Sequence, residues 1–149
     1  MTRSILPRLG LAALAGLGLM TAQPARAEPP RQVLALITSA EPQVQGMAFV
    51  LLNQMRMQGM TVEVMLCGAA ADLARREAPA PSPALRPSGA SPAQMLANMV
   101  RAGVRAEVCA LYLPNAGVAA DALIEGVRPA APPEMARRML AAETRVLPF

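Results

Sequence analysis

Histidine is missing from this chain of 149 residues, and lysine is missing too. Without histidine, the usual catalytic triads, histidine-ligated metals and imidazole bases are excluded. A cysteine thiol is then the best-suited group for covalent chemistry, and the chain has only two, Cys67 and Cys109. We therefore expect any covalent reaction to run through sulfur, with no metal ion and no other cofactor.

Aromatic side chains are almost absent, with one tyrosine, two phenylalanines and no tryptophan. Sites that hold bases or sugars by stacking need such side chains, so this class of binding site is disfavoured. The formal net charge of +4 overstates the basic character of the chain. Three of the arginines, Arg3, Arg8 and Arg26, lie in a segment that we expect to be removed. The remaining acidic and basic residues nearly balance, and we expect no nucleic-acid partner.

The first 27 residues have the pattern of a secretory signal peptide. Arg3 and Arg8 form a basic start, residues 9–20 are an unbroken run of small and apolar residues, and Ala25-Arg26-Ala27 fits a cleavage site. A membrane-spanning helix needs about 20 apolar residues, so this shorter run does not predict a stable membrane anchor. The sequence therefore predicts cleavage near Ala27 and a periplasmic or otherwise exported domain of residues 28–149.

Within that domain, apolar runs alternate with amphipathic stretches, and proline or glycine marks their ends. Continuously apolar runs are typical of parallel strands that are buried on both faces. The predicted strands cover residues 33–37, 61–68, 104–111, 123–127 and 145–149, and the predicted helices cover 42–58, 69–77, 92–102 and 133–143. This alternation predicts a three-layer α/β/α domain with a mostly parallel five-stranded sheet. Pro148 cannot donate a ladder hydrogen bond, so we expect the last strand at an edge.

The first predicted helix has apolar residues at helical spacing, which predict one buried face. They are Val44, Met47, Ala48, Leu51, Leu52 and Met55. The helix ends in Met55-Arg56-Met57-Gln58-Gly59-Met60, which is similar to the thioether motifs that hold copper(I). Met55 and Met57 point about 200° apart on a helix. We therefore interpret Met55 as a core residue and predict no metal site.

Two polar features are interpreted as surface structure. Residues 78–92 contain five prolines with serine and glycine between them, a composition that predicts a surface loop. Arg137 and Arg138 lie in the last predicted helix, and adjacent arginines of this kind are typical of a solvated helix face.

Cys109 and Cys67 fall at or near the carboxyl ends of the third and second predicted strands, where ligands collect in open α/β sheets. A thiolate exposed at such a position can accept a sulfane sulfur as a persulfide. The alternative is a buried cysteine that only fills the core. Tyr112 and Asn115 follow Cys109 and could line a pocket, although a turn at Pro114-Asn115 explains Asn115 equally well.

The residues around Cys109 resemble the exported branch of the DsrE/DsrF-like family. The resemblance runs from Ser91-Pro92 through Gly103-Val104 to Val108-Cys109-Ala110-Leu111-Tyr112-Leu113-Pro114-Asn115 and extends over roughly residues 31–149. It implies a flavodoxin-like three-layer fold, assembly into trimers or hexamers, and transport of sulfur as a cysteine persulfide. The reactive cysteine of that family follows the third strand, and Cys109 matches it. The implied partners are a sulfur donor or acceptor protein, or a small sulfur species, and further copies of the chain.

Cys67 is the position at which the chain departs from many relatives in that family. Two cysteines in an oxidising compartment tend to pair, and adjacent second and third strands, as in that family, would place them within disulfide reach. Two functions therefore stay open. One is an exported thiol protein that binds or relays sulfane sulfur through Cys109, as a sulfurtransferase or a carrier, with Cys67 as a redox partner. The other is a noncatalytic oligomeric binding module that a Cys67–Cys109 disulfide stabilises.

Overall fold

The computed structural model describes residues 31–149, so the predicted signal peptide and its cleavage site lie outside the described residues. Five strands form one sheet in the order β4-β3-β2-β1-β5. They are β1 (Gln32–Ile37), β2 (Thr61–Leu66), β3 (Arg105–Val108), β4 (Val127–Pro129) and β5 (Thr144–Pro148). Every neighbouring pair is parallel. The last strand lies at an edge beside β1, as its proline predicted.

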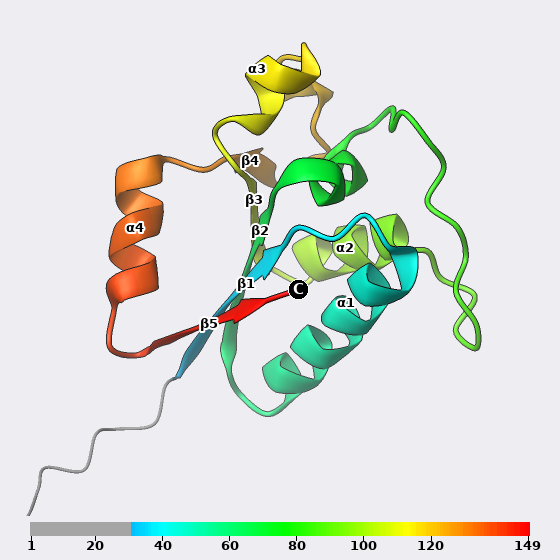
Figure 1. Cartoon of the computed structure of the whole chain (residues 1–149). Coiled ribbons are helices and arrows are strands. Elements are labelled where there is room, and N and C mark those ends of the chain that lie inside the picture. Colours follow the sequence, from blue (N-terminus) through cyan, green and yellow to red (C-terminus); the bar gives the residue numbers. More distant parts are fainter. Residues whose placement is uncertain (1–30) are drawn as a thin grey trace, which may run out of the picture.

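Helices cover both faces of this sheet, as Figure 1 shows. On one face lie α1 (Pro42–Met57), the 3₁₀ helix η1 (Gly68–Ala74) and α2 (Pro92–Arg101), and on the other lies α4 (Pro132–Leu140). The connection from β3 to β4 contains α3 (Tyr112–Ala116) and a second 3₁₀ helix, η2 (Ala120–Ala122). The predicted three-layer α/β/α fold is therefore confirmed. No helix in the described part of the chain is long and apolar enough to cross a membrane.

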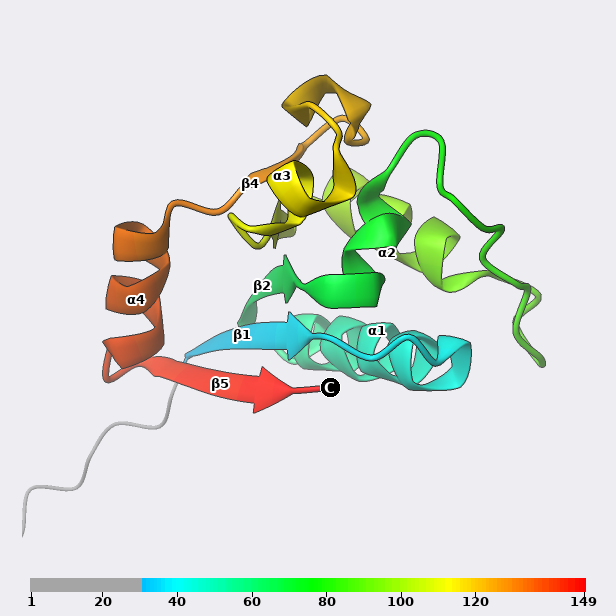
Figure 2. The same ribbon diagram turned by 45° about the horizontal axis from the view of Figure 1, so that its top comes forward.

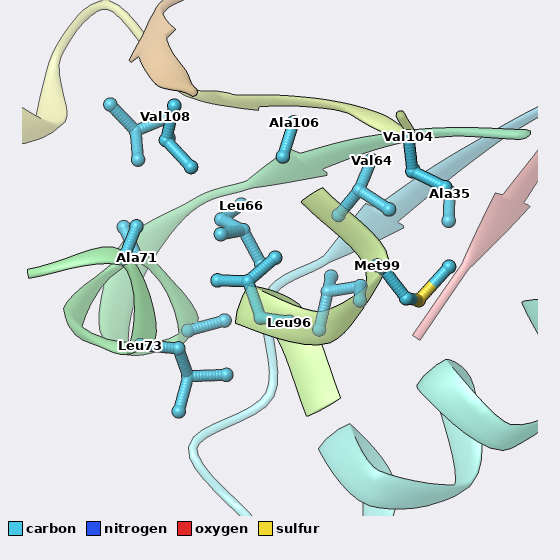
Figure 3. Packing of buried hydrophobic residues seen from close by; sticks show 14 of the residues in the cluster. Ala35, Val64, Leu66, Ala71, Leu73, Leu96, Met99, Val104, Ala106 and Val108 are labelled. Carbon is cyan, nitrogen blue, oxygen red and sulfur yellow. The ribbon is translucent and has the colours of Figure 1, made fainter. Parts of the chain in front are cut away.

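The main core fills the space between the sheet and α1, α2 and η1. Alternate strand residues such as Val64 and Val108 point into it and are almost fully buried, and Leu96 and Met99 of α2 pack against them (Figure 3). A smaller cluster on the other face joins Leu34, Ala130 and Met135 beneath α4. Burial on both faces explains why the first two strands read as apolar runs.

The predicted fourth strand, residues 123–127, is wrong in position. Leu123 forms only an isolated antiparallel bridge with Arg75, and β4 begins at Val127 and continues through Pro129. The chain turns before it at Gly126, where φ is +84°, a left-handed conformation that glycine adopts at little cost. The residues before this turn form a connection in which Leu123 is buried and Ile124 is half-buried.

The third strand is shorter than predicted, because it ends at Val108 and the chain turns into α3. Pro114 stands in the first turn of α3, where its missing N–H removes no helical hydrogen bond. Two predicted helices also differ in their bounds. The helix predicted over 69–77 is the 3₁₀ helix η1, which ends at Ala74, and the helix predicted over 133–143 is α4, which ends at Leu140. The early end of β3 places Cys109 just beyond the sheet.

Helix α1 does not bury all of its predicted apolar face. Ala48 and Leu52 are fully buried, but Val44, Met47 and Leu51 are 40%, 56% and 40% exposed. The three exposed residues follow one another at helical spacing, so they form a continuous strip along the outer side of α1. We call this set the α1 strip. An apolar helix surface of this kind has no partner within the described chain.

The proline-rich connection between η1 and α2 contains no α-helix or 3₁₀ helix over residues 76–91. Part of it nevertheless lies along α1, because Leu85 packs so tightly on Gly46 that a side-chain carbon there would collide with it. The hydroxyl of Ser82 also accepts a hydrogen bond from the N–H of Ala93 at 3.3 Å. These contacts hold the connection near the start of α1 and α2.

Candidate functional site

Cys67 and Cys109 stand next to each other at the carboxyl edge of the sheet. Leu66 of β2 pairs with Val108 of β3 in the parallel register, and each cysteine is the next residue along its strand. The N–H of Cys109 donates to the carbonyl of Leu66 at 2.9 Å, so the pairing of the two chains continues past the strands. Both thiols are free and half-buried. The structure thus brings the two sulfur-bearing residues together.

The surroundings of Cys67 make its thiol hold its proton firmly. Burial is the main cause that raises the pKa of the Cys67 thiol to about 12, and the hydrogen bond and charge of the Cys109 side chain add to it. The backbone N–H of Cys109 acts in the opposite direction. At neutral pH the Cys67 thiol is therefore protonated, and a thiol in that form is a poor nucleophile.

Cys109 opens into a cavity of about 380 Å³ between η1 and α3. Its lining residues come from these two helices and the turns before them. They are Gly68, Ala69, Asp72, Cys109, Leu111, Tyr112, Asn115 and Ala116. Gly68 makes the site compact, because its φ of +56° turns the chain from β2 directly into η1. Figure 2 shows α3 and the η1 segment on the same side of the sheet edge where β2 ends.

Tyr112 and Asp72 join the two walls of the cavity. The Tyr112 hydroxyl donates a hydrogen bond of 2.6 Å to Asp72 Oδ1. Burial, followed by this hydrogen bond and the Asp72 charge, raises the pKa of Tyr112 to about 12, and the nearby Arg75 partly offsets the rise. Sequence reasoning missed Asp72, because it lies 40 positions from Tyr112. Its place in the helix directly after the second strand was the only available signal.

Asn115 lines the cavity but also has a local structural role. Its side-chain amide donates to the carbonyl of Leu111 at 2.7 Å, which holds the turn that opens α3. This bond agrees with the interpretation of Asn115 as a turn residue. Tyr112 is therefore the predicted pocket residue with a polar contact across the cavity.

A search of the described residues finds no cluster of three or more histidine, cysteine, aspartate or glutamate side chains that could hold a metal ion.

The α4 face of the sheet carries a buried ion network that corrects one interpretation of the sequence. Arg138 of α4 binds Glu63 of β2 at 2.5 Å and Glu107 of β3. Glu107 is 2% exposed and the Arg138 side chain is 13% exposed, so Arg138 does not belong to a solvated face, whereas Arg137 does. Two carboxylates that point from the sheet toward α4 need a buried countercharge, and Arg138 supplies it.

Comparison with known proteins places the fold. The chain matches no protein-family model and no curated protein. The chain shares its fold with the ychN protein from E. coli. That crystal structure aligns with a TM-score of 0.60 at 21% identity, over 80% of this chain and 99% of the other. MTH1491 from Methanobacterium thermoautotrophicum, a protein of unknown function, aligns with a TM-score of 0.58 at 16% identity, over 79% and 98%. At these identities the likeness shows a common fold.

Proposed function

We propose that the protein is an exported member of the DsrE/DsrF-like family that binds or relays sulfane sulfur as a persulfide on Cys109. The observation that carries this proposal is the position of Cys109, a free thiol that faces a cavity at the carboxyl end of a central strand. Its neighbour Cys67 holds a proton at neutral pH, since its pKa is raised to about 12. The shared fold and the residues that follow Cys109 support the family assignment. The signal-peptide pattern of residues 1–27 supports export.

The proposed loading step is a displacement at sulfur. The Cys109 thiolate attacks the outer, sulfane sulfur of a donor such as thiosulfate, and the bond between the two donor sulfurs breaks. Sulfite leaves with the electron pair of that bond, and the new sulfur takes a proton to give Cys109–S–SH. The cavity of about 380 Å³ has room for a small anion of this kind. No external oxidant is required, because the donor already holds sulfur at the sulfane level.

Mass spectrometry of the folded protein tests this function. After incubation with thiosulfate or polysulfide, we expect an adduct of about +32 Da on Cys67→Ser and no adduct on Cys109→Ser. Serine nearly preserves the volume of cysteine but cannot form a persulfide. Circular dichroism of both variants controls for folding. Equal loading of Cys67→Ser and folded Cys109→Ser would overturn the proposed role of Cys109.

The register of the two strands favours a second candidate function. Cys67 and Cys109 follow paired residues, so a disulfide between them would fit the backbone and could stabilise a noncatalytic binding module. In the chain-entropy model such a bond contributes about 3 to 4 kcal/mol. If the exported protein carries only this disulfide, resists mild reductant and takes up no sulfur, the second function replaces the first.

We also propose that the chain assembles with further copies of itself through the α1 strip. Val44, Met47 and Leu51 are apolar, exposed and adjacent along one helix. An uncharged strip of this kind is complementary to a second copy of itself, as a two-fold interface requires. Assembly would withdraw these side chains from water without adding a buried charge.

A further inference from the structure

The backbone geometry places the two cysteines within bonding reach. Neighbouring strands lie about 4.8 Å apart, and the Leu66–Val108 register pair continues into Cys67 and Cys109 through the 2.9 Å bond from Cys109 N–H to Leu66 O. A disulfide accepts Cα separations of about 4.4 to 6.8 Å. The spacing of the strands therefore places the Cα atoms of the two cysteines within the range that a disulfide accepts.

The cavity makes the two thiols unequal in access. Of the two described cysteines, Cys109 lines the cavity, and Cys67 lies beside it without lining it. A donor that enters the cavity therefore meets Cys109 first. Once Cys109 carries a persulfide, its inner sulfur still faces Cys67 across the strand ends, whereas its outer sulfur extends toward the cavity.

We propose that Cys67 is a resolving thiol, which discharges the Cys109 persulfide as hydrogen sulfide and leaves a Cys67–Cys109 disulfide. This inference rests on the proposed function, because it needs the persulfide to form. It adds an activity to that function: the protein would release reduced sulfur into solution, and it would not only carry sulfane sulfur to a protein acceptor.

The step balances within the protein. The Cys67 thiol gives up its proton as its sulfur attacks the inner sulfur of Cys109–S–SH, and a bond forms between the two cysteine sulfurs. The bond from the Cys109 sulfur to the outer sulfur breaks, and its electron pair leaves with the outer sulfur. That sulfur is reduced and takes the proton from the Cys67 thiol to complete H₂S, while the Cys67 sulfur is oxidised. A dithiol reductant then restores both thiols by disulfide exchange.

The test compares the reduced full-length wild type with Cys67→Ser under anaerobic conditions. Each is mixed briefly with inorganic polysulfide, desalted, and followed by intact mass and by sulfide assay. We expect the wild type to become about 2 Da lighter than its reduced form and to release one sulfide per chain, while Cys67→Ser keeps the adduct of about +32 Da.

Two further samples separate the possible outcomes. Donor-free wild type should form no disulfide, which excludes adventitious oxidation, and Cys67→Ala should retain the adduct as Cys67→Ser does, which excludes an effect of the serine hydroxyl. A wild type that holds the adduct as long as Cys67→Ser, or that moves it onto Cys67, would overturn the resolving role and leave the persulfide on Cys109 standing. Failure of folded Cys67→Ser to take up any sulfur would instead overturn the proposed function itself.

Discussion

Tyr112 is the first residue of α3 and lines the same cavity as Cys109. Its ring is buried, and its hydroxyl donates to Asp72 at 2.6 Å from the opposite wall. A bond of this length to a carboxylate is stronger than one between neutral groups. It therefore fixes the distance between η1 and α3, and with it the width of the cavity that Cys109 lines.

The titration of Tyr112 can be followed directly, because it is the only tyrosine in a chain without tryptophan. We expect tyrosinate absorbance to appear with a midpoint near pH 12, above the ordinary value of 10. Since the folded state raises this pKa, the stability that the neutral phenol contributes is complete below pH 10 and is lost as the pH rises to 12. A spectrophotometric titration of the folded protein measures the midpoint.

Asp72→Asn is the matched variant for this titration. The amide keeps the size and an acceptor oxygen but removes the negative charge, so the midpoint should fall while staying above 10, because burial is the larger cause. A wild-type midpoint near 10, or an unchanged midpoint in Asp72→Asn, would contradict the role assigned to this pair.

At the same scale, the sequence predicts part of the site and misses the rest for a physical reason. Cys109, Tyr112 and Asn115 are close along the chain, so a local pattern suffices to group them. Asp72 comes from a different crossover, and only the adjacency of β2 and β3 brings it to Tyr112. Local patterns carry no information on such a contact, because it depends on which strands are neighbours.

Among the helices, α4 depends most visibly on a buried charge. Its small apolar core joins Met135 to Leu34 and Ala130, and Arg138 anchors it to the sheet through Glu63 and Glu107. Glu107 also forms an ion pair with Arg128 of β4, with 3.0 Å between Arg128 Nε and Glu107 Oε1. The network therefore connects α4, β2 and β4 to β3. It meets β3 at Glu107, two residues before Cys109.

We expect Arg138→Ala to lower the free energy of unfolding by about 3 to 5 kcal/mol, because it leaves two carboxylates buried without their main countercharge. Arg137→Ala is the matched control, since Arg137 is exposed on the same helix, and it should stay within about 0.5 kcal/mol of the wild type. Urea denaturation measures both. Similar small losses in the two variants would show that the network contributes little to stability.

The helices and strands that the sequence predicts well are those with strong local signals. β1, β2 and α1 combine long apolar runs with proline or glycine at their ends, and they appear close to the predicted bounds. The prediction placed β4 too early in the chain, because the residues of this strand, Val127-Arg128-Pro129, include a charge and a proline that are unusual in strands. Its edge position tolerates both. α3 was missed because Pro114 reads as a turn, although the first turn of a helix accepts proline.

At the scale of the whole molecule, the α1 strip is an apolar surface that has no partner among residues 31–149. The sequence predicts that the strip is buried, because helical spacing alone does not show which of two apolar faces of a helix packs against the sheet. In this fold, Ala48 and Leu52 meet the sheet, and Val44, Met47 and Leu51 face outward. The apolar residues of α1 therefore have two roles. Some pack in the core of the chain, and the others, in our proposal, form the interface between two copies of it.

Light scattering at micromolar concentration tests this assembly. We expect the wild type to have a molar mass that is a multiple of one chain, and Met47→Glu to shift toward the mass of a single chain. A carboxylate buried in an apolar interface costs at least about 2 kcal/mol per copy, which weakens association roughly thirtyfold for each of the two copies that meet there. Leu140→Glu is the control, because Leu140 is 86% exposed but lies on α4, across the sheet from the strip. It should leave the assembly intact. A wild type that is monomeric under these conditions would refute the proposed assembly, and equal dissociation by both variants would refute the α1 strip as its interface.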